Sequence, residues 1–184
     1  MRNELSLDLA TRLVNHSPVL LVSSLYAGKT DLTPVAWHMP VSKDPPVIAL
    51  EIGENHHIYK CIMETGDFVV NILSKDYTGQ IVKCGSCSGR DVDKTEICGF
   101  SLEASRFVRS YSLKEAAAVL ECVLIRDEHL LREYNMVPAE IKYAEVCEGF
   151  FSGHWLFDKR GFKTIHHLGD GTFCAPDMVF GGAG

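Results

Sequence analysis

Three cysteines near the middle of the chain have a spacing that could support metal or redox chemistry. Cys84 and Cys87 form a C-x-x-C pair, and Cys98 follows downstream. A zinc site would need a second C-x-x-C pair or suitably spaced histidines, and neither is present. A redox dithiol is expected at the start of a helix, where the dipole stabilises a thiolate, whereas this pair follows a predicted helix. The spacing therefore favours buried structural thiols over zinc or redox chemistry.

Two histidine pairs offer imidazoles that could bind a metal. They are His56-His57 and His166-His167. Adjacent side chains seldom point at one centre, and no carboxylate is spaced around either pair as a ligand would be. We therefore predict no metal site and interpret these histidines as surface or helix-capping residues.

The segment from Gly85 to Lys94 has the composition of an anion-binding loop. Its glycines leave backbone N–H groups free, while Ser86, Ser88, Arg90 and Lys94 add hydroxyl donors and positive charge. A phosphate group would fit such a loop, and an ordinary solvated loop before a capped helix explains the same residues equally well. No G-x-G-x-x-G, P-loop, H-E-x-x-H or G-x-S-x-G motif occurs, which argues against a Rossmann-type nucleotide site.

Apolar runs bounded by turn residues predict the strands that would position these groups. We predict strands over residues 19–22, 32–39, 47–52, 68–73, 117–125 and 141–147. The connection over residues 26–31 is too short for a helical crossover, so the first two strands are expected to be antiparallel neighbours. Trp37, within the second strand, is interpreted as a core side chain. The expected fold class is mainly β, an antiparallel barrel or sandwich.

A few short helices are predicted between the strands. Asn55 is the expected N-cap of a helix that ends at Gly66. A second helix follows Ser74 and stops at Gly85, and Asp93 is placed to cap a third. The segment between the last two strands is highly charged, and the tail is rich in loops.

Length and composition restrict the classes of protein to be considered. The 184 residues are expected to form a single domain spanning positions 1–184. The net charge of −6 argues against a nucleic-acid partner, because phosphate neutralisation needs a surplus of cations. No apolar stretch approaches the ~20 residues that span a bilayer, and residues 1–13 lack the apolar core of a secretory signal. Seven cysteines, an odd number, suit reduced thiols, so we expect a cytoplasmic protein without a membrane partner.

Four segments in order resemble a known family. Residues 18–24, 33–46, 66–72 and 88–94 are similar to the flavin reductase-like, flavoredoxin-type family of FMN-binding split barrels. The resemblance extends over about residues 18–94 and thins toward the C-terminus. It implies a six-stranded antiparallel Greek-key split barrel with a few short helices. It further implies a homodimer that holds FMN noncovalently near the subunit interface.

The resemblance also implies a set of cofactor-binding residues. Along the isoalloxazine it places Asp31, Thr33, Pro34, Val35, Ala36 and Trp37, with Val41 and Ser42 beside them. On the phosphate side it places Ser88, Arg90 and Lys94, with Asn55, His56 and His57 in a segment where relatives often have hydroxyl residues. His166, or its neighbour His167, is expected to line the nicotinamide or flavin face. No catalytic residue is assigned, because hydride transfer between two cofactors needs no protein acid or base.

Three departures from the family pattern bear on cofactor affinity. Asp31 stands where relatives often have asparagine, and Ile58 offers no side-chain hydrogen bond where a hydroxyl is common. Residues 137–140 replace the Gly-x-His-Thr pattern of many relatives. The leading hypothesis is an FMN-dependent NAD(P)H:flavin oxidoreductase. The alternatives are an FMN electron carrier that serves a protein partner, and a non-catalytic binding protein on the same fold.

Overall fold

The computed structural model describes residues 1–157 and 161–181 of the chain. The strands are β1 (Arg2–Glu4), β2 (Leu20–Tyr26), β3 (Lys29–Val35), β4 (His38–Lys43), β5 (Pro46–Glu51), β6 (Asp67–Ile72), β7 (Leu102–Glu103), β8 (Ser112–Leu113), β9 (Ala118–Leu124), β10 (Met136–Cys147), β11 (His166–Gly169) and β12 (Thr172–Cys174). The helices are α1 (Leu7–Ala10), α2 (His57–Thr65), α3 (Thr78–Gly85), α4 (Lys94–Cys98) and α5 (Glu128–Tyr134), with 3-10 turns η1 (Thr11–Leu13) and η2 (Lys75–Tyr77).

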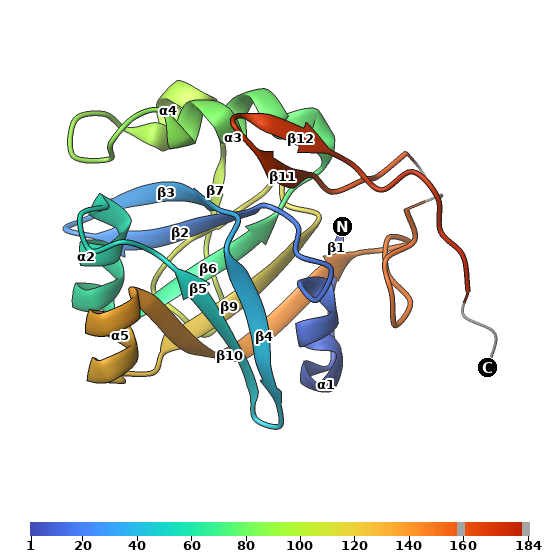
Figure 1. Cartoon of the computed structure of the whole chain (residues 1–184), viewed down its shortest axis with the longest axis horizontal. Helices are drawn as coiled ribbons and strands as arrows, with labels where there is room; N and C mark the ends of the chain where they lie inside the picture. The colour runs from blue at the N-terminus through green and yellow to red at the C-terminus, as the bar shows by residue number, and fades with distance from the viewer. Residues whose placement is uncertain (158–160, 182–184) are drawn as a thin grey trace.

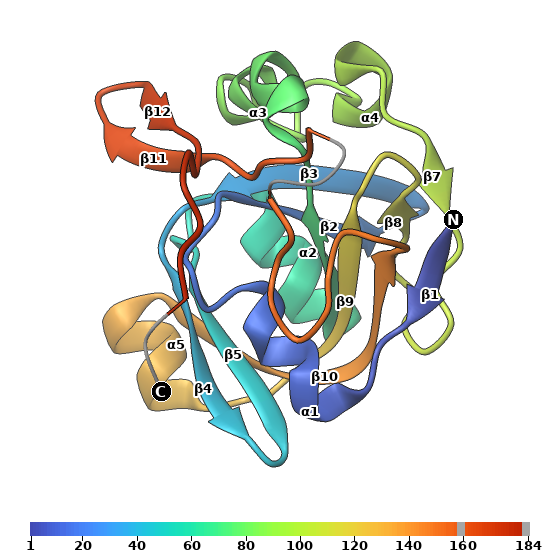
Figure 2. The same cartoon turned by 90° about the vertical axis from the view of Figure 1, so that its right-hand side faces the viewer.

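One curved antiparallel sheet dominates the fold (Figures 1 and 2). Its strand order is β3-β2-β6-β9-β10-β5-β4, and β1 pairs with β10 beside this path. The two ends of the path, β3 and β4, are consecutive in the chain and are joined by Ala36 and Trp37. The mainly β, antiparallel prediction is confirmed, although this sheet has eight strands rather than six.

Both faces of the β2 and β6 region are buried, which explains the unbroken apolar runs in the sequence. Leu20 and Val22 belong to the core inside the curved sheet, whereas the intervening Leu21 belongs to a second core. This second core includes Ile81 and Cys84 of α3, so it lies between the sheet and that helix. Alternate residues of a strand point to opposite faces, so a strand covered on both sides is mostly apolar. Hydrogen bonds satisfy the buried polar side chains of these two strands, which include Ser23, Ser24 and Asn71.

The predicted helices are present, and their ends differ in detail. Gly66 ends α2 in the left-handed conformation, and Asp93 accepts hydrogen bonds from the first turn of α4, as expected. Ser74 caps the 3-10 turn η2, which continues into α3. Gly85 is the last residue of α3 rather than the residue that stops it. His56, and not Asn55, is the N-cap of α2.

Three segments differ more strongly from the sequence-based expectation. The predicted strand over residues 32–39 is broken at Ala36 and Trp37, and Trp37 is 73% exposed, so its interpretation as a core residue is wrong. Helix α5 occupies the charged stretch, where Asp127 caps it and its Leu131 is buried. Strand β10 begins at Met136, well before the predicted start at residue 141.

Candidate functional site

Two adjoining hollows lie where β3 turns toward β4. The first, of about 230 Å³, is lined by residues 33–37 together with Glu51, Ile52, Gly53 and His56. The second, of about 270 Å³, lies between the start of α2 and the segment that connects α3 to α4. Thr33 and His56 line both hollows, so the two form one continuous candidate site.

The second hollow, which we call the anion cavity, has the chemistry of a phosphate site. Its lining residues are Thr33, Asn55, His56, His57, Gly85, Ser86, Cys87, Ser88, Gly89, Arg90 and Lys94. None of these is acidic, although the whole chain carries a net charge of −6. Hydroxyl groups, imidazoles and two permanent cations are the side chains that hold phosphate oxygens. The residue set therefore fits an anion of phosphate type.

The N-terminus of α2 adds backbone donors to the anion cavity. Its N-cap, His56, makes no side-chain hydrogen bond to the first turn, so the turn has no side-chain cap. The first N–H groups of a helix have no partner within the helix, and the helix dipole makes them attractive to anions. Ile58 is fully buried in the core and is not among the lining residues of the anion cavity, so its side chain does not contribute to the site.

The loop from Ser86 to Asp93, which we call the anion loop, is folded tightly against its surroundings. The backbone N–H groups of Asp91 and Val92 both donate to the carbonyl of Ser88. The Arg90 guanidinium donates to the carbonyl of Asn55 at 3.0 Å, which links the anion loop to the start of α2. Gly89 passes so close to Asp31 that a Cβ at Gly89 would lie 2.2 Å from Oδ1.

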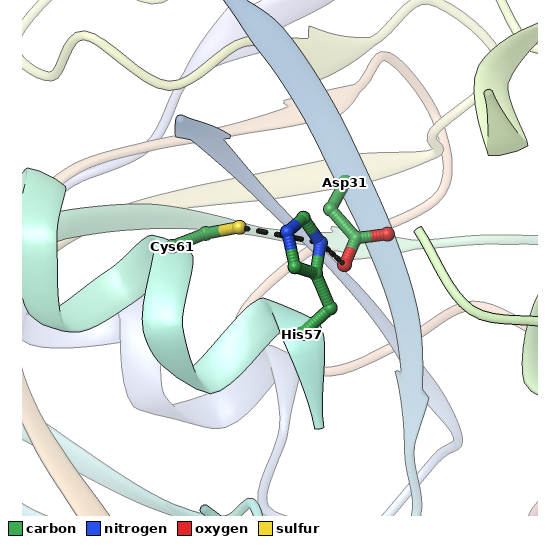
Figure 3. Close-up of side chains that lie close together, drawn as sticks. All are labelled: Asp31, His57 and Cys61. Atoms are coloured by element: carbon green, nitrogen blue, oxygen red, sulfur yellow. Dashed lines mark hydrogen bonds and ion pairs between the residues drawn. The ribbon is translucent and has the colours of Figure 1, made fainter. Parts of the chain in front are cut away.

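A polar cluster of Asp31, His57 and Lys94 adjoins the anion cavity, and Figure 3 shows Asp31 and His57 together with Cys61. The Asp31 carboxylate accepts from its neighbour's backbone, Leu32 N–H, at 2.8 Å, and it lies 3.0 Å from His57 Nδ1. The Lys94 ammonium lies 3.6 Å from Asp31 Oδ1 and donates to the Leu32 carbonyl at 2.7 Å. Lys94 is only 4% exposed, which excludes a solvated residue at a helix start. Asp31 therefore positions His57 and Lys94. It lines neither of the two hollows, but it lines an adjoining hollow of about 370 Å³ that shares His57, Gly89 and Arg90 with the anion cavity.

Cys61 lies beside this cluster but is neither a nucleophile nor part of a relay. Its sulfur is 3.7 Å from Nδ1 of His57, the same nitrogen that contacts Asp31. A relay would need the thiol on the other ring nitrogen. Burial and the nearby Asp31 charge raise the pKa of Cys61 to about 12, so the thiol stays protonated. His57 and Cys61 are one helical turn apart, and this i, i+4 spacing is the signal that sequence reasoning missed.

Asp31, His57 and Cys61 are the one group of potential metal ligands that converge within residues 1–157 and 161–181. Their ligand atoms lie within 4.8 Å of one another. The Lys94 ammonium lies 3.6 Å from Asp31 Oδ1 and compensates its charge, and Nδ1 of His57 is already in contact with Asp31 Oδ2. We therefore account for this group as a hydrogen-bonded support. Cys84, Cys87 and Cys98 do not converge in the same way, so the alternative of a three-cysteine zinc site is not supported.

The predicted site residues do not all lie in the two hollows. Val41 and Ser42 lie on β4 outside both linings, and Val41 is 55% exposed. His166 lines a separate cavity with His16 and Trp155. Its neighbour His167 lines an apolar pocket of about 440 Å³ that shares Pro34 and Ala36 with the first hollow. Successive residues of β11 point to opposite sides, so only one of the two histidines can face this region.

The half-buried imidazole of His16 has a predictable effect on stability. Burial, and the charges that nearby His166 and His38 would carry, lower the pKa of His16 to about 4. The unfolded chain takes up this proton below about pH 6.5, whereas the folded chain stays neutral to about pH 4. Stability is therefore expected to fall by about 2–3 kcal/mol as the pH drops across this interval.

Urea denaturation at pH 7.5 and pH 4.5 measures this effect. His16→Phe should reduce the difference in unfolding free energy between the two pH values. His129→Gln, on the exposed face of α5, is the matched control and should retain the full difference. An equal loss in wild type and His16→Phe would contradict the assignment to His16.

Comparison with known proteins identifies the family to which this arrangement belongs. The model of the flavin reductase-like domain matches residues 12–166. The chain belongs to the flavin reductase-like family. The uncharacterized protein YddH of Escherichia coli (strain K12) is a relative that is 31% identical over 168 residues, covering 89% of each chain. The resemblance seen in residues 18–94 is thus confirmed and extends well beyond them.

Solved structures of the family share the split-barrel fold of this chain. An FMN-binding domain of a flavin reductases-like enzyme from Shewanella baltica OS155 matches with a TM-score of 0.95 at 25% identity, covering 100% of this chain and 98% of that chain. Flavoredoxin of Desulfovibrio vulgaris (Miyazaki F) matches with a TM-score of 0.79 at 22% identity, covering 91% and 90% of the two chains. Among the described residues, no helix of this family member is long and apolar enough to cross a membrane.

Proposed function

We propose that this protein is an FMN-dependent oxidoreductase of the NAD(P)H:flavin reductase type. The observation that carries the proposal is the anion cavity, which has no acidic lining residue in an acidic protein and includes the uncapped start of α2. The hollow along residues 33–37 continues from it and offers a surface for a planar ring system. The phosphate of FMN would occupy the anion cavity, and the isoalloxazine would lie along β3.

The residues of the site bind and orient the cofactor. Lys94 has three N–H donors, of which the Leu32 carbonyl takes one, so others remain for a phosphate oxygen. Arg90 and Ser88 add donors from the anion loop, and His56 and His57 add imidazoles from α2. Strand β3 ends the strand path, so one of its edges has no strand partner and can lie beside the flavin. The Leu32 N–H is already donated to Asp31 and Pro34 has no N–H, so neither is a donor for the flavin. When bound, FMN supplies the hydride chemistry.

A comparison of FMN with riboflavin tests this assignment. The two ligands share the ring system and differ by the phosphate, so FMN is expected to bind at least about tenfold more tightly. Fluorescence quenching titrations in low and moderate salt measure both affinities. Equal affinities would refute the phosphate role of the anion cavity, and a protein that quenches neither ligand would refute flavin binding altogether.

Steady-state oxidation of NADH or NADPH separates the proposed reductase from its alternatives. A flavin reductase oxidises one of them in the presence of FMN. An electron carrier of flavoredoxin type holds FMN but needs a protein donor, so it shows no such turnover. A colourless protein that stays colourless with added FMN would indicate a non-catalytic binding protein on this fold. The pocket next to residues 34 and 36 that contains His167 is the space in which we place the nicotinamide.

A homodimer is expected from the exposed face of β4. Trp37, Met39 and Val41 alternate along this part of the chain and are 73%, 49% and 55% exposed. Three neighbouring large apolar side chains on one edge are typical of a subunit contact.

Light scattering across a dilution series should give twice the monomer mass. The double variant Met39→Lys/Val41→Lys should give monomers, whereas Ile125→Lys, at another exposed apolar position, should not. A wild-type monomer that binds stoichiometric FMN would contradict the expectation that FMN is held near the interface between two subunits.

A further inference from the structure

Two buried cysteines lie in contact beneath the anion loop. Cys84 belongs to α3 and Cys98 is the last residue of α4, and their sulfur atoms are 3.1 Å apart. Both belong to the core between these helices and the sheet. Figures 1 and 2 show α3 and α4 side by side above β3. Lys83 also joins the two helices through a hydrogen bond to the carbonyl of Ile97.

This pair differs from the one that the sequence spacing suggests. Cys84 and Cys87 form the C-x-x-C pair, yet the sulfur of Cys87 donates to the carbonyl of Lys83 instead. All seven cysteines are among the described residues, and Cys84–Cys98 is the one sulfur-to-sulfur contact in that part of the chain. A disulfide bond has a sulfur separation of about 2.05 Å, so the two sulfur atoms would have to approach each other by about 1 Å.

The chain between the two cysteines contains the whole anion loop. Ser88, Arg90 and Lys94 all lie between positions 84 and 98, and each lines the anion cavity. A bond between Cys84 and Cys98 would therefore enclose these residues in a covalent ring. Such a ring restricts the movement of α4 relative to α3 and limits the conformations that the loop can reach when it opens.

We infer that Cys84 and Cys98 are a modification site at which a peroxide forms a reversible disulfide that holds the anion loop closed. The effect on FMN rests on the proposed function, whereas formation of the disulfide does not. Reduced flavin that reacts with dioxygen is a general source of peroxide, so the proposed activity would supply the oxidant at the site. A dithiol reductant would reverse the reaction by thiol–disulfide exchange.

The reaction proceeds in two balanced steps. Cys98 is 6% exposed and Cys84 is fully buried, so Cys98 is the sulfur that meets peroxide first. One oxygen of the peroxide is transferred to Cys98 to give a sulfenic acid, and one water leaves. The Cys84 sulfur then displaces the hydroxyl group as a second water, and the S–S bond forms. The two thiols lose two electrons in total, and the peroxide gains them.

The environment of Cys84 makes this modification slow at neutral pH. Burial and the contact with Cys98 hold the pKa of Cys84 well above its usual range, so its thiolate is scarce. Because the thiolate is the attacking species, the cross-link is expected to form faster at pH 9 than at pH 7. This slowness distinguishes the pair from a catalytic dithiol and suits a response to sustained peroxide.

Mass spectrometry of the intact full-length protein tests the cross-link. Hydrogen peroxide at low stoichiometry should lower the mass by two hydrogens, and peptide mapping should join the peptides that contain Cys84 and Cys98. Cys98→Ser should abolish this species. Cys87→Ser and Cys122→Ser, which remove a nearby and a distant thiol, should retain it. Absence of the joined peptide in wild type, or its loss in Cys87→Ser, would overturn the assignment.

Two readouts test the closing of the loop. FMN should dissociate about three- to tenfold more slowly from the oxidised protein than from the reduced protein. Trypsin should cleave more slowly after the exposed Arg90 in the oxidised protein, and this readout needs no bound FMN. Unchanged cleavage would overturn the closure. Slower cleavage in a protein that binds no flavin would uphold the closure and refute the proposed function instead.

Discussion

Replacing Lys94 with alanine is expected to weaken FMN binding by about ten- to more than a hundred-fold, because a charge-assisted hydrogen bond to phosphate contributes about 1.5–3 kcal/mol. Turnover at saturating FMN should change little, since the ammonium serves retention of the cofactor rather than hydride transfer. Equilibrium titration and steady-state kinetics measure the two quantities separately. Unchanged affinity would exclude the phosphate role, and collapsed turnover with unchanged affinity would place Lys94 at the nicotinamide instead.

The burial of Lys94 requires a control for stability. The variant leaves Asp31 without its cation and the Leu32 carbonyl without its donor, so we expect the fold to lose about 3 kcal/mol as well. Asp31→Asn/Lys94→Ala removes the uncompensated charge and should recover part of that stability. FMN affinity should stay low in the double variant, because the ammonium is still missing. Recovery of affinity together with stability would mean that Lys94 acts only through the fold.

Gly89→Ala is expected to cost about 1–3 kcal/mol of stability through overpacking and to weaken FMN binding by at least about tenfold. The added Cβ would lie 2.2 Å from Asp31 Oδ1, and Asp31 is held by Leu32 N–H, His57 and Lys94, so it has little room to move. The anion loop must then lift away from the cavity. Urea denaturation and FMN titration measure the two effects.

Two further variants separate the clash from a general intolerance of alanine. Gly79→Ala, in α3 with no atom within 4 Å of the added Cβ, should leave FMN affinity unchanged. In an Asp31→Ala background, Gly89→Ala should add little further loss, because the atoms it would meet are gone. Additive losses in that double variant would show that the close contact with Asp31 is not the cause.

Local sequence patterns were sufficient for most of the sheet and for several helix ends. Apolar runs located β2, β5, β6 and β9, because strands that are buried on both faces are mostly apolar. Gly66 and Asp93 were predicted as helix-terminal residues from their conformational and hydrogen-bonding properties alone. The glycine, hydroxyl and cationic residues of positions 85–94 are typical of an anion-binding loop and of a solvated loop alike, so the phosphate role of this loop stays a prediction.

The sequence-based predictions that were wrong concern segments whose structure depends on contact with a distant part of the chain. The apolar pattern around Trp37 predicts a buried strand residue, yet the chain turns there from one end of the strand path to the other and leaves the side chain exposed. The start of β10 contains Pro138, which disfavours strand prediction, and its pairing with β5 and β9 overrides that preference.

Composition and patterns within a few residues were enough for the fold class and the family. Which groups meet depends instead on the packing of the whole chain. That packing buries Lys94 beside Asp31, brings Cys84 against Cys98 rather than against Cys87, and turns His167 rather than His166 toward the pocket that contains Pro34 and Ala36. Each outcome depends on how α3, α4 and the tail pack against the sheet, and that packing is a long-range property that no local spacing encodes.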